Sequence, residues 1–357
     1  MPISVFTYGN EKFSGIQNIG EHLYMSQIEN NIKSFLDWGF LNIGGFINVE
    51  KPQTNIYGNP LATLKPTEDP NYQTGQVWQT MRKDWVWEDG ITYSRCLPPM
   101  VPVSSPYPTL PETSPTPCPS EYIKTSDPIL ISGIYINNVF HPLNISGPFA
   151  YKVDYINSRI IFTNPIPINT SVSMEYSYRW IQVYNYDNAK WWQQLQYRTD
   201  ANSEHFNQIN KGDFSILSNN RVQLPAIIIE TISRGLSKPW QLGDKSLIMK
   251  QELMLHIVAE TMHDRNMLID IIRLQQDKVI VMYDINKVIR NGVQPFNIDG
   301  TLNPNRVKYD LLVNSPSYLW HSARLIDIFA SDVESFSPFF AEANLKITVE
   351  LIFLISN

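Results

Sequence analysis

Residues 245–260 read KSLIMKQELMLHIVAE, and apolar side chains alternate with polar ones along most of this stretch. One face of the strand that this alternation predicts carries Leu247, Met249, Leu253, Leu255, Ile257 and Ala259. The opposite face carries Glu252 and His256. A period of two with one apolar side is typical of an antiparallel strand that packs on a core and leaves its other side polar.

The same pattern recurs on both sides of this segment and is interrupted once by a helical period. Strands are predicted at residues 226–232, 278–284, 317–329 and 342–356, and a helix with Met267, Leu268, Ile271 and Ile272 on one stripe is predicted at residues 264–276. Strands and helices that are not strictly alternating favour an α+β fold. We therefore expect residues 221–357 to form an antiparallel sheet flanked by helices.

Residues 1–50 are expected to belong to the same core. Apolar residues at helical spacing predict a helix over residues 21–38, and Gly39 stands where a helix C-terminal cap is usual. Residues 40–51 then predict two short strands around a Gly-Gly turn.

Residues 51–127 hold many of the 25 prolines and predict Pro-rich extended arms. Such arms are either passive spacers or straps across a neighbouring subunit. Trp78, Trp85 and Trp87 lie between the two Pro-rich stretches. We expect these tryptophans to be buried at an interface, because large aromatic side chains need apolar surroundings.

Residues 128–184 predict an inserted all-β module, either a meander or a small sandwich. Asn137 and Asn138 separate two apolar runs and favour a hairpin turn. Residues 150–180 alternate three times, with turns between the alternating runs. Residues 185–220 are expected to form a helix or a long connector.

Composition and motifs narrow the classes of function. The net charge is −6, charged residues are 17% of the chain, and Lys and Arg form no dense run, which argues against a nucleic-acid grip. Cys96 and Cys118 are too few for a disulfide framework or a zinc site, so free thiols and no cofactor are expected. The N-terminus lacks a signal-peptide pattern, and the chain is expected to be soluble and intracellular. No phosphate loop, nucleophile elbow or dinucleotide motif occurs, so no catalytic and no metal-binding residue is predicted.

The length of the predicted strands points to self-assembly. Strands in small domains usually have about five or six residues, and longer ones either extend a large monomeric sheet or pair between subunits. We favour pairing between copies of the chain in a closed ring. Glu252, His256 and Lys346 are the polar-face candidates for the interface, beside Trp78, Trp85 and Trp87.

The C-terminal residues resemble a known family. A proline opens the apolar strand of residues 224–232, and a loop then ends in Leu242-Gly243-Asp244. Residues 264–270 read Asp-Arg-x-x-Leu-x-Asp, and residues 343–350 read Ala-x-Leu-x-x-x-x-Glu. In this order the elements resemble the tail-terminator and neck proteins of tailed bacteriophages, over about 140 residues.

The resemblance implies a structural virion protein rather than an enzyme. Members of that family form rings, commonly hexamers, at the head–tail junction, where they end the tail and join it to the neck. The implied partners are other copies of the chain and the neighbouring neck, tail-tube and sheath proteins, with genomic DNA passing through the lumen unbound. The implied location is the virion, after assembly in the host cytoplasm.

Two other classes of function remain open from the sequence. The β-module could serve a baseplate or receptor-binding tail component that contacts a host glycan. An enzyme of unrecognised class is the second alternative, since catalytic groups need not be neighbours in sequence.

Overall fold

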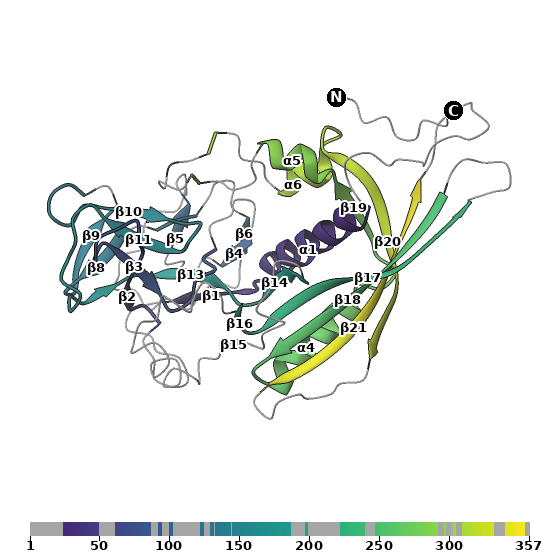
Figure 1. Cartoon of the computed structure of the whole chain (residues 1–357), viewed down its shortest axis with the longest axis horizontal. Coiled ribbons are helices and arrows are strands. Elements are labelled where there is room, and N and C mark those ends of the chain that lie inside the picture. Colours follow the sequence, from purple (N-terminus) through teal and green to yellow (C-terminus); the bar gives the residue numbers. More distant parts are fainter. Residues whose placement is uncertain are drawn as a thin grey trace.

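The structure is a computed structural model in which strands predominate and helices are few, so the described chain is α+β (Figure 1). It describes residues 24–49, 61–86, 92–94, 100–102, 122–124, 129–131, 133–143, 145–186, 197–198, 222–239, 247–291, 296–297, 301, 303–304, 309–331 and 340–353. None of the helices in these ranges is both long enough and apolar enough to cross a membrane. Cys96, Cys118 and most of the expected connector lie outside the described residues.

The largest element is a six-stranded sheet at the right of Figure 1. Its order is β14 (Gln182–Asn185), β17 (Ala226–Pro239), β18 (Leu247–Ala259), β21 (Ala341–Phe353), β20 (Leu319–Ser331) and β19 (Val279–Tyr283). Every neighbouring pair is antiparallel except β14 and β17, which are parallel. The four long strands have 13 or 14 residues each, as the alternating sequence predicted for β18, β20 and β21.

Two helices cover one face of this sheet. Helix α1 (Tyr24–Asn42) contributes Ile28, Ile32, Leu36 and Phe40, and helix α4 (Met262–Arg273) contributes Leu268 and Ile272. Beneath them lie the alternating apolar side chains of the strands, among them Leu253, Leu255, Leu345 and Ile347, all at most 2% exposed. Each such side chain adds about 1.5–3 kcal/mol to stability when it is fully buried.

Helix α1 ends later than the sequence predicted. It continues through Gly39 to Asn42, and Gly44 adopts a φ of +88°. The Gly44 N–H donates to Leu41 O and the Gly45 N–H donates to Phe40 O, which is the Schellman arrangement. Residues 40–51 therefore contain one strand in the described part, β1 (Phe46–Val49), and the predicted pair of strands was wrong.

The β-module lies at the left of Figure 1 and is larger than residues 128–184. One sheet has the order β10 (Tyr151–Asp154), β11 (Arg159–Phe162), β3 (Val77–Thr80) and β2 (Leu64–Thr67). Another has the order β12 (Val172–Ser173), β8 (Gly133–Ile136) and β9 (Val139–Pro142), and β1 pairs with β13 (Tyr176–Arg179). Residues 61–86 are thus part of the module rather than an extended arm, and the expected meander is distributed over three sheets.

The remaining elements are short. Two-stranded pairs are formed by β4 (Thr92–Ser94) with β6 (Tyr122–Lys124), β5 (Met100–Pro102) with β7 (Ile129–Ile131), and β15 (Tyr197–Arg198) with β16 (Val222–Gln223). Helices α5 (Ile285–Asn291) and α6 (Tyr309–Asn314) follow β19 along the chain.

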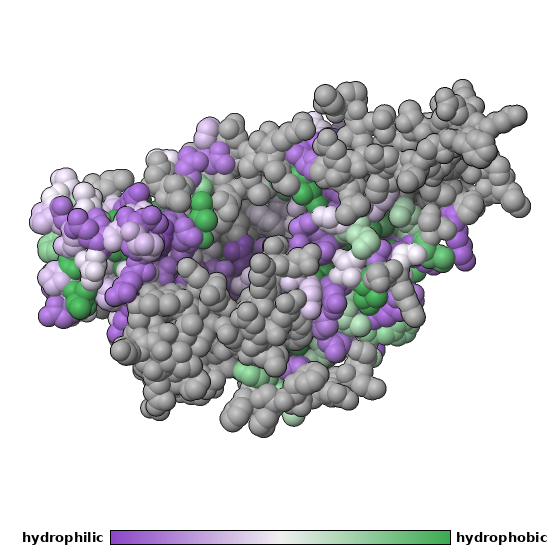
Figure 2. All heavy atoms as spheres, in the orientation of Figure 1, coloured by the Kyte–Doolittle hydropathy of each residue, from purple (hydrophilic) through white to green (hydrophobic). Residues whose placement is uncertain are grey.

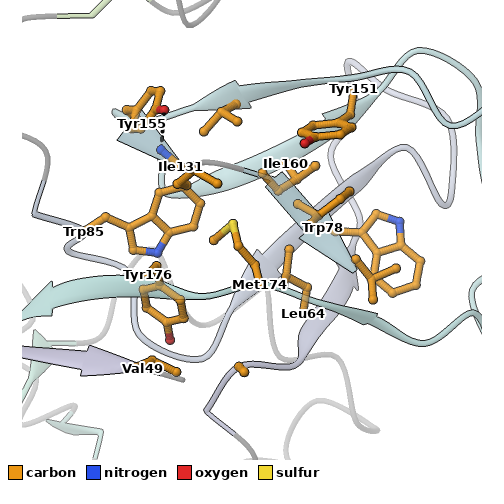
Figure 3. Close-up of a cluster of buried hydrophobic side chains, with 14 of the residues drawn as sticks. Val49, Leu64, Trp78, Trp85, Ile131, Tyr151, Tyr155, Ile160, Met174 and Tyr176 are labelled. Carbon is orange, nitrogen blue, oxygen red and sulfur yellow. Dashed lines mark hydrogen bonds between the residues drawn. The ribbon is translucent and has the colours of Figure 1, made fainter. Parts of the chain in front are cut away.

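The core of the β-module is aromatic (Figure 3). The Trp85 ring lies between Tyr155 and Tyr176, with centroid distances of 6.4 and 5.8 Å, and its Nε1–H donates to Thr80 Oγ1 at 2.8 Å. Trp78 packs edge-on to Phe162 and donates from Nε1 to Gly75 O at 2.9 Å. Both indoles thus have their polar atom satisfied inside the module.

The module and the six-stranded sheet are joined by backbone and side-chain contacts. The Trp180 N–H donates to Gly45 O at 3.0 Å, and Arg179 Nε pairs with Asp37 Oδ1 at 3.0 Å. Burial raises the pKa of Asp84 at this junction, and the nearby Arg179 charge opposes that rise. The Arg179 guanidinium makes a second bond to Asp37, from Nη2 to Oδ2 at 3.4 Å, and this bidentate pair ties α1 to β13.

Candidate assembly surface

The face of the six-stranded sheet opposite to α1 and α4 is polar along β18 and β21. We call it the helix-free face. It carries Lys250, Glu252, Met254 and His256 from β18 and Glu342, Asn344, Lys346, Thr348 and Glu350 from β21. The strict alternation that buries the leucines on one side of these strands places all of these residues on the other side.

Ion pairs cross this face between adjacent strands. Lys250 Nζ lies 3.0 Å from Glu350 Oε2 on the residue directly opposite, and Lys346 Nζ lies 2.6 Å from Glu252 Oε1 on the diagonal. Exposed cross-strand pairs of this kind contribute about 0.2–1 kcal/mol each. Their stronger effect is on register, because a one-residue slip would bring the charged row to the helix side.

His256 bridges three strands of the helix-free face. Its Nδ1 is 2.8 Å from Asn344 Oδ1 on β21, and its Nε2 is 2.7 Å from Glu230 Oε2 on β17. Two hydrogen bonds to oxygen acceptors require a proton on both ring nitrogens, unless the Asn344 amide is turned so that its NH₂ faces the ring. Burial raises the pKa of the neighbouring Glu342, and the His256 charge lowers it.

The predicted interface residues fall into two groups. Glu252, His256 and Lys346 lie together on the helix-free face, within the two central strands. Trp78 and Trp85 are 1% and 0% exposed inside the core of their own module, so the expectation that a neighbouring subunit buries them was wrong. The partners that bury them come from residues 61–86 and 151–178, whose pairing was not visible as a local pattern. Trp87 lies outside the described residues.

One edge of the six-stranded sheet is open over most of its length. Strand β14 pairs with β17 from Ala226 to Ile229, and no other strand in the described ranges pairs with the outer edge of β17 from Glu230 to Pro239. These residues still pair with β18 on the inner side. Figure 1 shows the ends of β17, β18 and β21 extending to the right past α1.

The open edge contains a β-bulge between Thr231 and Gly235. The Gln251 side chain satisfies a backbone carbonyl within the bulge, because its Nε2 donates to Ile232 O at 2.6 Å. Bulges, lysines and prolines restrict promiscuous edge pairing, and Lys238 and Pro239 follow the bulge here. Gly235 is the local sequence feature that accompanies the bulge, and the loop predicted directly after residue 232 was wrong, because β17 continues through the bulge to Pro239.

The opposite edge, β19, is partly closed by α1. The Asn31 amide donates to Tyr283 O and accepts from Tyr283 N, both at 2.9 Å, so it replaces a partner strand at that residue. Ser34 Oγ and Tyr283 Oη are 2.6 Å apart, and burial raises the pKa of Tyr283. The two edges of the sheet are therefore not equivalent, as head-to-tail contacts require.

The metal-ligating side chains in the described part of the chain do not gather into a site. No group of three or more His, Cys, Asp or Glu side chains within it could hold a metal ion. No protein-family model matches the sequence, and a search of curated proteins finds no similar protein.

Proposed function

We propose that the chain is a structural virion protein of a tailed phage that assembles into a ring at the head–tail junction. The observation that carries this proposal is the outer edge of β17 from Glu230 to Pro239, with which no described strand pairs, on a sheet whose strands continue past the helices. Backbone N–H and C=O groups at such an edge are satisfied by water in a monomer and by a partner strand in an assembly.

The sequence resemblance supplies the choice of assembly. It implies the tail-terminator and neck class, with an α+β domain whose sheet contacts build the ring. The non-equivalent edges formed by β17 and β19 support a head-to-tail contact, which closes into a ring when the rotation between copies divides a full turn. We take six as the number of copies from the resemblance alone.

The helix-free face supports a non-binding role toward DNA. Three of its lysine and arginine side chains, Lys250, Lys346 and Arg324, are each held in an ion pair with a carboxylate 2.6–3.0 Å away. DNA phosphates could bind these cations only if the ion pairs were broken first. The cost of breaking them would offset much of the binding free energy that counterion release supplies. The β-module then projects as an added domain toward sheath, collar or neck proteins.

Labelling of virions tests the proposed location. Gold-conjugated antibody against the β-module should mark the junction between head and tail in electron micrographs of intact particles. Label at the distal end of the tail would instead support the baseplate or receptor-binding alternative, and unlabelled particles would contradict both.

A further inference from the structure

The hairpin formed by β8 and β9 presents two aromatic rings on its outer face. Asn137 and Asn138 have φ angles of +49° and +68°, which is the two-residue turn that matches strand twist. Ile134 and Ile136 point into the module core at 0% and 2% exposure, so Tyr135 points outward. Phe140 lies opposite Tyr135, with the ring centroids 5.3 Å apart, and is 45% exposed.

The Phe140 ring packs over Gly133. A Cβ added to Gly133 would lie 2.6 Å from Phe140 Cζ, so the ring covers the bare backbone of that residue. A ring held in this way loses little conformational entropy on binding a ligand. Apolar surface is visible at the left end of the molecule, over β8 and β9 (Figure 2).

The backbone on the outer side of this pair has no partner strand in the part of the chain that the structure describes. Strand β9 is the last strand of its sheet among the described residues. In a two-residue hairpin the pair flanking the turn, here Ile136 and Val139, exchanges both hydrogen bonds. The N–H and C=O of Phe140 therefore point away from β8, toward the free edge. The edge thus offers one donor next to two aromatic rings.

The hairpin and the residues that flank it in sequence carry no charged side chain. Residues 128–151 contain no Asp, Glu, Lys or Arg, and His141 is their one titratable imidazole. A charged ligand would lose hydration here without gaining a partner, so the surface suits an uncharged one. Proline-rich segments suit such a surface. They adopt the polyproline II conformation before binding, and their rings pack on aromatic faces. Their carbonyl groups accept hydrogen bonds, while proline has no N–H group that would need an acceptor.

The chain itself contains such a segment close by. Residues 103–121 hold six prolines, and Glu112 and Glu121 are their charged residues. The segment follows Pro102, which pairs with Ile129 of β7, and β8 begins at Gly133 shortly after β7 ends. At about 3.1 Å per residue, a segment of this length that leaves the module and returns to it can reach roughly 30 Å from its anchored ends. The four-residue hairpin strands span only about 13 Å.

We propose that the Tyr135–Phe140 pair is a docking site for the proline-rich segment of residues 103–121 of the same chain. Proline rings pack on the two aromatic faces, and a segment carbonyl accepts a hydrogen bond from the Phe140 N–H. The site goes beyond the proposed ring function, since it would exist in a free protomer as well as in an assembly.

Disulfide trapping in the full-length protein tests the proposal. In a Cys96→Ser background, Cys118 is the reporter within the segment, and Pro142→Cys places a thiol on the same hairpin face as Phe140, because Pro142 is exposed and stands two residues along the strand. Ile156→Cys is the matched control, because Ile156 is also an exposed apolar residue of the module but lies in the β10–β11 turn. Rates of disulfide formation under a mild oxidant are read on non-reducing gels.

We expect the intramolecular disulfide with Pro142→Cys to form at least about tenfold faster than with Ile156→Cys, because docking raises the effective concentration of the segment at the site. Phe140→Leu, which keeps an apolar cover over Gly133 but removes the aromatic face, should slow it several-fold. Equal rates at the two positions, or no effect of Phe140→Leu in a protein with unchanged circular dichroism, would overturn the proposal. Crosslinked dimers in place of the intramolecular product would also overturn it and assign the segment to a neighbouring copy. None of these outcomes depends on ring formation, which is measured separately by mass.

Discussion

Replacing Trp85 with alanine tests whether the aromatic residues of the β-module stabilise the module or its contacts with a partner. Trp85 is 0% exposed, packs between Tyr155 and Tyr176, and donates from Nε1 to Thr80 Oγ1. A buried aromatic side chain removes about 150–250 Å² from water, and at about 25 cal/mol per Å² this gives about 4–6 kcal/mol. Measured Trp→Ala changes in cores are about 3–5 kcal/mol, so we expect a loss in that range.

The assay must resolve the module from the six-stranded sheet, because a protein with two cores need not unfold in one step. Hydrogen exchange read by mass spectrometry across a urea series follows peptides from β10 and β11 separately from peptides of β18 and β21. We expect Trp85→Ala to lower the midpoint of the first set and to leave the second nearly unchanged.

Trp85→Phe is the matched control, since it keeps an aromatic ring while removing the Nε1–H donor. It should cost less than the alanine variant, by the difference in buried area. A change under about 1 kcal/mol in module stability for Trp85→Ala, together with weakened association between copies, would refute the reasoning and restore Trp85 as an interface residue.

Three further predictions concern single sites. Gly44→Ala should lower stability by about 1–2 kcal/mol in thermal denaturation, because alanine at a φ of +88° is strained although nothing lies within 4 Å of its Cβ. Gly39→Ala in the helix is the control and should be neutral or stabilising by up to about 1 kcal/mol. Equal effects of the two substitutions would contradict the assignment of Gly44 to the helix cap. A double-mutant cycle of unfolding free energies with Lys346→Met and Glu252→Gln should give a coupling energy of about 0.2–1 kcal/mol, and this energy should fall at high salt. A coupling energy that salt leaves unchanged would show that packing rather than charge joins the two side chains. Burial raises the pKa of Glu342, so ionisation costs the folded state more than the unfolded state. Glu342→Gln should therefore raise the melting temperature at pH 7, and the gain should shrink as the pH falls through the raised pKa and be absent below the ordinary Glu range. A gain that grows toward low pH would mean that the carboxylate is stabilised in the fold.

The long strands were predictable from the sequence because their signal is local. Leu253, Leu255 and their counterparts in β21 alternate with charged residues, and burial on one side of a sheet dictates that alternation. The same logic located Glu252, His256 and Lys346 on a common polar face before their partners were known.

Features that depend on distant segments were not predictable in this way. Trp78 and Trp85 stand between Pro-rich stretches, and only the pairing of β3 with β11 shows that the module core surrounds them. The end of α1 was misplaced because Gly39 and Gly44 are both glycines after an apolar helical run, and helix propensity does not decide which one takes a positive φ. The parallel β14–β17 pair and the resulting open edge follow from topology rather than from either strand alone.

The most direct test of self-assembly is the mass and symmetry of the purified full-length protein. Mass photometry combined with class averages from negative-stain images reads both in one sample. We expect a closed ring with six-fold symmetry and a mass near six times 41.2 kDa. A single species of 41.2 kDa that persists at micromolar concentration, with the outer edge of β17 exchanging its amides freely, would contradict it.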